Sequence, residues 1–233
     1  MRVGYQRNRL GFGSRRLALA AWAAGISVAL MLSASGEALA AGASNVVPGN
    51  GKVAGHGYGY WLQRSWQATF SASPPANPCQ SLTSSGQRVG YLTLKTLAPG
   101  TDHYTCNEAA GRPIYVVGLS NECSTLKGDH GKFGTSDQQL KRCARALFVE
   151  GAKDTTTVDG QSVNVDTLVA ATGEYAVHVP KNNPFGISPG KGRSAAYGFG
   201  LLLTGFAKGT HIIHTLWGIG TEKWDITFTV HVH

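Results

Sequence analysis

The sequence lacks the signatures of several large protein classes. It has no C-x-x-C pair and no internal repeat of fixed period. The pattern G-x-S-x-G of a nucleophile elbow occurs only as GISPG, 186–190, where no parallel strand leading into a helix is expected, and Ser120 lies in GLSNE. The segment GISPGKGRS resembles a phosphate loop, but Gly192 follows Lys191 where Ser or Thr would contact Mg²⁺. We therefore expect neither of these two chemistries.

A long apolar run is also missing. The uncharged run at the N-terminus, 17–32, has 16 residues, fewer than the roughly 20 that a spanning helix needs. Five arginines precede it and Ala-Leu-Ala at 38–40 follows it, so residues 1–40 are typical of a cleaved signal peptide. An uncleaved anchor is the weaker alternative, and no stable membrane span is expected after cleavage. The Sec route and the twin-arginine route, which Arg15-Arg16 resembles, both stay open.

Basic charge is less abundant than the whole chain suggests. The full sequence has 21 Lys+Arg and 13 Asp+Glu, a net charge of +8. Residues 1–40 contain five of those arginines and one glutamate, so 16 basic and 12 acidic residues remain, a net charge of +4. No run of Lys and Arg with interleaved aromatics is left, so nucleic acid is not an expected partner.

The four cysteines are widely spaced. Cys79, Cys106, Cys123 and Cys143 are separated by 27, 17 and 20 residues. An even number of cysteines in an exported chain indicates two disulfides, and four cysteines allow three pairings. Zinc is the competing use, but the close ligand pairs typical of zinc sites are missing.

The remaining chain predicts one domain with few helices. Residues 41–57 are small and glycine-rich, which indicates a flexible lead-in, and 58–233 suit a single domain. Leu62, Trp66 and Phe70 recur at helical spacing, and this helix must end before the prolines of SPPANPC. We expect Trp61 and Trp66 to anchor it on the core. A second helix begins at the capping box SDQQ, 136–139.

Strand patterns dominate elsewhere. Asp159-Gly160 between two β-branched runs predicts a hairpin. About nine short strands without βαβ alternation predict a mainly β fold. We expect an antiparallel β-sandwich, Ig-like or jelly-roll-like, with one or two short helices inserted.

The last residues, THIIHTLWGIGTEKWDITFTVHVH, predict a terminal hairpin with Trp217 and Trp224 beside its turn. Strand alternation places His231 and His233 on one face. His211 joins them only if cross-strand partner numbers sum to an even number. In that register His211, His231 and His233 could hold Cu²⁺ or Zn²⁺. The alternative is a set of solvent-facing edge histidines.

An ordered series of motifs resembles a family of exported bacterial proteins of unassigned function. The series is CNEAAGRPIYVVGLSNEC, SDQQLKRCARAL, VDGQSV, VHVPKNNPFGI and GFGLLLTGFAKGTHIIH, covering most of 58–230. The family's motif positions fall on Cys106, Gly111, Arg112, Asn121, Glu122, Cys123, Cys143, Asp159, Gly160, Asn183, Phe185, Gly186, Gly209 and His211. The resemblance implies an exported single domain with a Cys123–Cys143 disulfide, which leaves Cys79–Cys106. It implies no reaction and no catalytic residue.

The polar candidates for a site are Asn121 and Glu122. Oxygen ligands on a loop held by a cysteine could take Ca²⁺. The alternative is that both side chains bond backbone amides at a strand-to-loop bend. Trp217 and Trp224 are the candidate stacking residues, although they are also expected to pack across the hairpin.

Three functions follow from these features. The first is non-enzymatic binding of a glycan or a protein at the cell envelope or outside it, without a cofactor. The second is a hydrolase of envelope polysaccharide, which needs two acids about 5 to 9.5 Å apart in a groove. The third is metal binding through the terminal histidines. The sequence names neither the ligand nor the oligomeric state.

Overall fold

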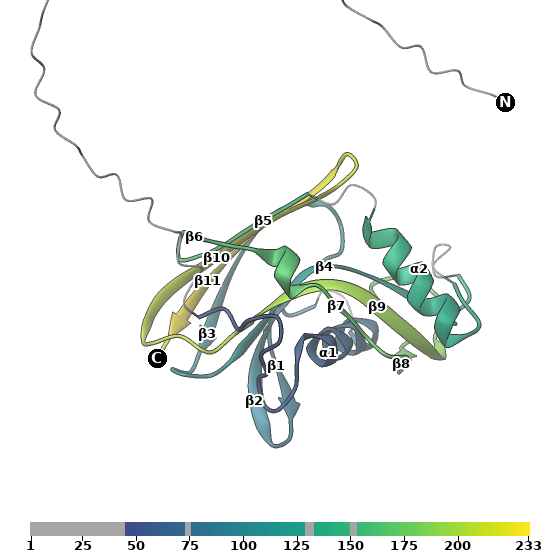
Figure 1. The fold of residues 1–233 in the computed structure, drawn as a ribbon, viewed down its shortest axis with the longest axis horizontal. Helices are drawn as coiled ribbons and strands as arrows, with labels where there is room; N and C mark the ends of the chain where they lie inside the picture. The colour runs from purple at the N-terminus through teal and green to yellow at the C-terminus, as the bar shows by residue number, and fades with distance from the viewer. Residues whose placement is uncertain (1–44, 73–75, 129–132, 150–152) are drawn as a thin grey trace, which may run out of the picture. The chain divides into compact units, whose positions relative to one another are not determined.

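The domain is built from two β-sheets and two helices. A computed structural model describes residues 45–72, 76–128, 133–149 and 153–233, so the signal peptide expected at 1–40 lies outside the described residues. The two sheets pack through a shared hydrophobic core, which confirms the mainly β sandwich with short helices (Figure 1). Within the described ranges, no helix is long and apolar enough to cross a membrane.

The first sheet is centred on two long strands, β4 and β9. In spatial order it contains β1 (Cys79–Ser84), β2 (Gln87–Leu92), β4 (Ile114–Ser124), β9 (Gly190–Leu203) and β7 (Ala170–Ala171), with β8 (Tyr175–Val179) also paired to β9. β2 and β4 run parallel, and the other pairs are antiparallel.

The second sheet contains the terminal hairpin. Its order is β3 (Gly100–Glu108), β11 (Glu222–Val232), β10 (Gly209–Ile219), β5 (Lys153–Val158) and β6 (Gln161–Val163). β3 and β11 run parallel, a pairing that the antiparallel expectation did not contain. A 3₁₀ turn, η1 (Val165–Leu168), follows β6.

Two helices cover opposite faces of β4 and β9 where these strands extend beyond the second sheet (Figure 1). α1 (Tyr58–Ser71) lies over the face on which Trp66 Nε1 donates to Ser120 Oγ at 3.1 Å. α2 (Asp137–Val149) lies over the face on which Cys123 is bonded to Cys143. Because adjacent strand residues point to opposite sides, Ser120 and Cys123 face different helices.

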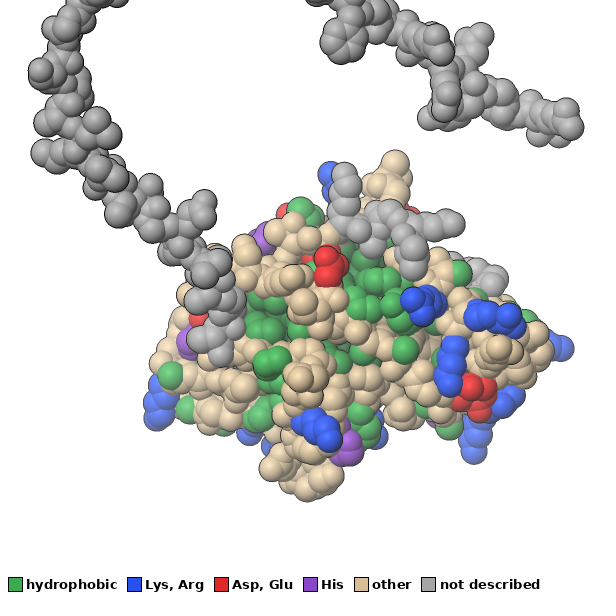
Figure 2. Space-filling model, in the orientation of Figure 1, with side chains coloured by type: hydrophobic (Ala, Val, Ile, Leu, Met, Phe, Trp, Pro, Cys, Tyr) green, Lys and Arg blue, Asp and Glu red, His purple; other side chains and the backbone are tan. Residues whose placement is uncertain are grey.

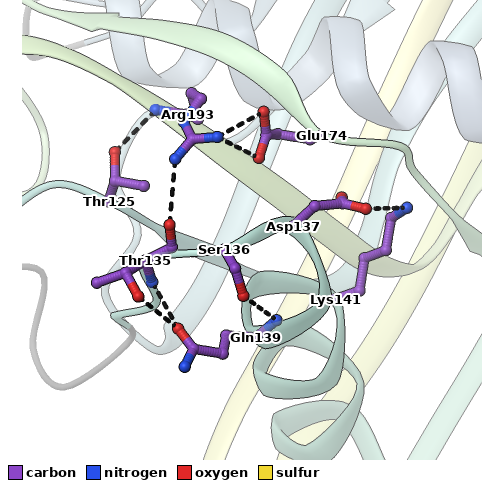
Figure 3. Close-up of polar contacts among 8 residues, drawn as sticks. All are labelled: Thr125, Thr135, Ser136, Asp137, Gln139, Lys141, Glu174 and Arg193. Carbon is purple, nitrogen blue, oxygen red and sulfur yellow. Dashed lines mark hydrogen bonds and ion pairs between the residues drawn. The ribbon is translucent and has the colours of Figure 1, made fainter.

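The predicted start of α2 is confirmed with one difference (Figure 3). Ser136 Oγ accepts a hydrogen bond from the Gln139 N–H at 3.4 Å, as in a capping box. The Gln139 side chain accepts from the Thr135 N–H at 2.8 Å instead of reaching back to Ser136. Arg193 on β9 donates to the Thr135 carbonyl and to Glu174, which ties the helix start to the first sheet.

Both disulfides implied by the family resemblance are present, Cys79–Cys106 and Cys123–Cys143. The first joins β1 of the first sheet to β3 of the second. The second joins β4 to α2. Two disulfides indicate a protein that folds in an oxidising compartment.

The segment 45–57 is packed, which differs from the flexible lead-in expected for 41–57. Val47 and Val53 are 4% and 6% exposed, and the Val47 N–H donates to the Leu202 carbonyl at 2.9 Å. Glycine content indicated flexibility, but the few valines of the segment bury themselves against β9 and α1. Residues 41–44 lie outside the described residues.

The two hairpins expected from the sequence are present. Asp159 and Gly160 have φ of 50° and 77° between β5 and β6, the left-handed backbone that a two-residue turn of this kind requires. In β11, Ile226, Phe228 and Val230 are fully buried, which confirms the predicted alternation.

Candidate functional site

Two clefts lie between the sheets and the helices. The aromatic cleft, with a volume of about 300 Å³, lies between α1, β4 and the tip of the β10–β11 hairpin. The acidic cleft, of about 680 Å³, lies between α2, β5, η1 and β9. Only Leu119 lines both, so the two clefts open on different sides of β4.

The first wall of the aromatic cleft is formed by Trp66 and Phe185. Their rings are stacked at 6.3 Å between centroids, with an interplanar angle of 23°. The buried amide of Asn183 holds Phe185 in place, because its Oδ1 accepts from the Phe185 and Ile187 N–H groups at 3.1 and 3.2 Å. Its Nδ2 donates to two carbonyls. The Asn-x-Phe-Gly turn therefore positions one aromatic wall.

The second wall is formed by Trp217 and Trp224. These residues are direct cross-strand partners at the end of the hairpin, as the sequence suggested. Trp217 Nε1 donates to Thr215 Oγ1, and Trp224 Nε1 donates to the Leu97 carbonyl at 3.2 Å. Trp66 Nε1 is also bonded within the protein. All three indole N–H groups are thus bonded within the protein and are not available to a ligand.

The floor is the irregular part of β4. The register against β9 shifts between Val117 and Ser120, and Gly118 lies in this bulge. A Cβ on Gly118 would stand 2.4 Å from the Phe199 carbonyl oxygen, so a larger residue here would push the two strands apart. The bulge changes the direction in which the side chains after it point.

Asn121 belongs to this floor through its place in β4, but its side chain points away from α1. Strand alternation puts it on the same side as Cys123, and its cross-strand partner is Tyr197, which packs against Phe148 of α2. The residue is 8% exposed, and its Nδ2 is buried without a hydrogen-bond partner among the described residues. A buried unpaired donor costs about 1 to 3 kcal/mol.

Glu122 is not among the residues that line this cleft, and it does not share one site with Asn121, which corrects their pairing as ligand candidates. The two residues are consecutive within β4 and therefore point to opposite faces. Glu122 is 1% exposed, and its Oε2 accepts from Ser194 Oγ at 2.7 Å. The expected strand-to-loop bend is also absent here, since β4 continues to Ser124.

The terminal histidines do not form the three-residue cluster that an even register would give. His211 pairs with Val230, an odd sum, so His211 lies on the same side as the buried residues and His231 on the other. His211 instead stacks on Phe206 and places Nδ1 2.8 Å from Asp159 Oδ2. In the described part of the chain, no three His, Cys, Asp or Glu side chains are grouped as metal ligands.

The acidic cleft contains two carboxyl groups among aromatic rings. Asp154 and Asp166 line it together with Phe148, Tyr197 and Phe199. Burial raises the pKa of Asp154 from 3.8 to about 7; the Thr156 hydrogen bond opposes this rise and the charge of Asp166 adds to it. Figure 2 shows hydrophobic side chains gathered in the middle of one face, with Lys and Arg side chains over the α2 end.

A chain of hydrogen bonds links the two clefts through the core. Thr156 Oγ1 donates to Asp154 Oδ1 at 3.1 Å and lies 2.9 Å from Thr215 Oγ1. Because Thr156 has one hydroxyl hydrogen, Thr215 must donate to Thr156. Thr215 in turn accepts from Trp217 Nε1. Three donors in series therefore point from the aromatic cleft toward the Asp154 carboxyl.

Sequence reasoning identified part of this arrangement. Asn121, Trp217 and Trp224 do line one cleft, as three of the four ligand candidates. Trp66 was assigned to the core, and Phe185 was recognised only as part of a turn motif. Asp154 and Asp166 carried no local signal, because neither belongs to a motif and their proximity arises from tertiary structure.

Comparison with known proteins provides little further guidance. No family model and no curated protein matches the sequence. The solution structure of amebosin is 13% identical and covers 57% of this chain and 96% of its own, with a TM-score of 0.21. PbICP-C, solved in complex with falcipain-2, is 10% identical and covers 62% of this chain and 98% of its own, with a TM-score of 0.24. At these TM-scores neither similarity bears on fold or function.

Proposed function

We propose that this protein is an exported, non-enzymatic binding domain that takes a glycan in the aromatic cleft. The observation that carries this proposal is the combination of four aromatic residues with several hydroxyl-bearing residues in the lining of one cleft of about 300 Å³. This size and mixture of many apolar groups with a few polar ones are typical of small-ligand sites.

The chemistry of the cleft matches a sugar ring. Trp224 and Phe185 are partly exposed lining residues, and their rings are apolar surfaces against which the C–H face of a sugar can stack. Trp217 is 4% exposed and supports this wall from the core. Ser120, Thr69 and Thr93 carry hydroxyl groups that can bond the oxygens of the same sugar.

The same cleft does not support the hydrolase alternative. Glu222 is the only acid among its lining residues in the described part of the chain. Most glycosidases use two carboxyl groups across the bond that they cleave. We therefore place binding before hydrolysis at this site.

The location is part of the proposal. The two disulfides support an oxidising extracellular or periplasmic compartment. The cell envelope as the place of action, export by the Sec or the twin-arginine route, and membership of the exported bacterial family are proposals that rest on the sequence motifs.

A glycan array followed by calorimetry on the glycans that bind tests this function. We expect at least one array glycan to bind with a Kd below about 1 mM. Trp224→Ala and Phe185→Ala should each weaken that binding about tenfold or more, because each loses a stacking face.

Phe133→Ala is the matched control. Phe133 is an exposed aromatic, 46% accessible, and does not line the cleft, so its removal should leave the affinity unchanged. Absence of any glycan binding, or equal affinity of all three variants and the unmodified protein, would contradict the proposal.

A further inference from the structure

We propose that the acidic cleft is a second binding site, independent of the first, for an organic cation such as an alkylammonium or guanidinium group. The site consists of Asp154 on β5 and Asp166 on η1, with Tyr197, Phe148 and Phe199 as its aromatic lining. Its volume of about 680 Å³ suits a ligand larger than a bare ion.

The charge of the cleft is uncompensated. Among the described residues, Asp154 and Asp166 are the only charged ones in its lining, and neither forms an ion pair with a described Lys, Arg or His. Arg145 contacts the aromatic lining, with its Cζ 5.4 Å from the Tyr197 ring centroid. The charge of Asp166 adds to the rise in the pKa of Asp154, and a positively charged ligand between the two carboxyl groups would offset this repulsion.

Only one of the two oxygens of the Asp154 carboxyl has a hydrogen-bond partner among the described residues. Its Oδ1 accepts from Thr156, and the chain through Thr215 fixes that hydroxyl in turn. Its Oδ2 is buried without a hydrogen-bond partner among the described residues. A buried carboxylate oxygen without a partner is unstable unless a donor or a cation reaches it. A cation bound in the cleft beside Asp154 would stabilise the charge of this carboxylate.

The aromatic lining favours an organic cation over a metal ion. Ammonium and guanidinium groups are attracted to aromatic faces by about 0.5 to 2 kcal/mol, whereas Ca²⁺ prefers six to eight oxygen ligands. Tyr197 already carries the Arg145 guanidinium and meets Phe148 edge-on, with centroids 5.4 Å apart. The lining offers two carboxyl groups and Asn164 as side-chain oxygen ligands, fewer than Ca²⁺ requires.

The test is an NMR titration of the protein with tetramethylammonium and with agmatine at pH 8, at constant ionic strength maintained with NaCl. We expect saturable shifts of backbone amides in β5, η1 and β9. At pH 6 the affinity should be about tenfold weaker, because a carboxyl with a pKa of about 7 is then mostly protonated.

Asp154→Asn should weaken binding about tenfold or more, since it removes one charge from the cleft. This variant relieves a buried carboxylate and should fold well. The matched control is Asp137→Asn, which removes the same charge from an exposed position at the start of α2 and should bind both probes as the unmodified protein does.

Three outcomes would overturn the proposal. The first is the absence of saturable shifts with either probe at about 10 mM. The second is equal affinity in the Asp154→Asn variant. The third is saturation by millimolar CaCl₂ with no response to either organic cation. None of these results depends on whether a glycan binds in the aromatic cleft.

Discussion

Trp217 and Asp154 are direct cross-strand partners on β10 and β5, yet each borders a different cleft. Thr215 and Thr156 connect them by hydrogen bonds, and both threonines are 1% exposed. One strand pair thus contributes a residue to each candidate site. A change in the charge of Asp154 is therefore expected to reach the indole of Trp217 through two buried hydroxyl groups.

The hydrogen bonds that connect Asp154 to Trp217 predict that tryptophan fluorescence depends on pH. The intrinsic tryptophan fluorescence should change with pH around a midpoint of about 7, as Asp154 ionises. The change should vanish in Asp154→Asn and shrink in Thr215→Val, which removes the hydroxyl that joins Trp217 to Thr156. A titration that is the same in all three proteins would show that the chain does not couple the two residues.

The burial of Asp154 also predicts how stability depends on pH. Its pKa is raised from 3.8 to about 7 in the folded protein, so between these values the folded state binds more protons than the unfolded state. The free energy of unfolding should therefore fall as pH rises from 4 to 7, by up to a few kcal/mol at about 1.4 kcal/mol per pKa unit. Urea unfolding at pH 5 and pH 8 measures this. Asp154→Asn should show a smaller difference between the two pH values, and an equal difference would contradict the assignment.

The two buried asparagines should respond oppositely to the same substitution. Asn121 and Asn183 are both 8% exposed, but Asn121 Nδ2 has no described partner and Asn183 makes four hydrogen bonds. Asn121→Leu should raise the free energy of unfolding by about 1 to 3 kcal/mol, whereas Asn183→Leu should lower it by about 2 kcal/mol or more. Chemical denaturation compares them. A destabilised Asn121→Leu variant would argue that the amide has a structural partner.

Asp159 should stabilise its hairpin in two separable ways. Its Oδ1 accepts from the Ile212 N–H and its Oδ2 contacts His211 Nδ1, both at 2.8 Å, and its φ is 50°. Asp159→Ala should cost about 1 to 2 kcal/mol, because it loses the hydrogen bonds and strains the turn. Asp159→Asn retains an acceptor and tolerates positive φ, so it should cost less. Thermal unfolding of both variants and of the unmodified protein measures these costs. If all three proteins had equal melting temperatures, the Asp159 side chain would not contribute to stability.

The two disulfides should contribute different amounts to the free energy of unfolding. Removing Cys123–Cys143 opens a loop of 20 residues and should cost roughly 3 kcal/mol. Removing Cys79–Cys106 opens 27 residues and also frees β1 from the second sheet, so we expect a slightly larger loss. Paired Cys→Ala variants in urea measure both. Mass mapping of a non-reduced digest should recover only these two linked peptide pairs.

Local patterns predicted much of the fold because their physics is local. The spacing of Leu62, Trp66 and Phe70 predicted α1, the SDQQ box predicted α2, and Asp159-Gly160 predicted a hairpin. Each depends on neighbours within a few residues. The parallel pairings of β2 with β4 and of β3 with β11 had no local signal, since parallel partners are joined by long connections.

Some features of the candidate sites were predictable from the sequence, and others depend on the tertiary structure. The sequence by itself determined which faces of β11 are buried, the turn that carries Phe185 and the pairing of Trp217 with Trp224, because strand period and turn chemistry are short-range. Only the tertiary structure decided that His211 turns away from His231, because a register of one residue reverses a strand face. Tertiary structure also decided that Trp66, Phe185 and Trp217 meet in one cleft and Asp154 with Asp166 in another. These residues are brought together only when both sheets and both helices pack around the shared core.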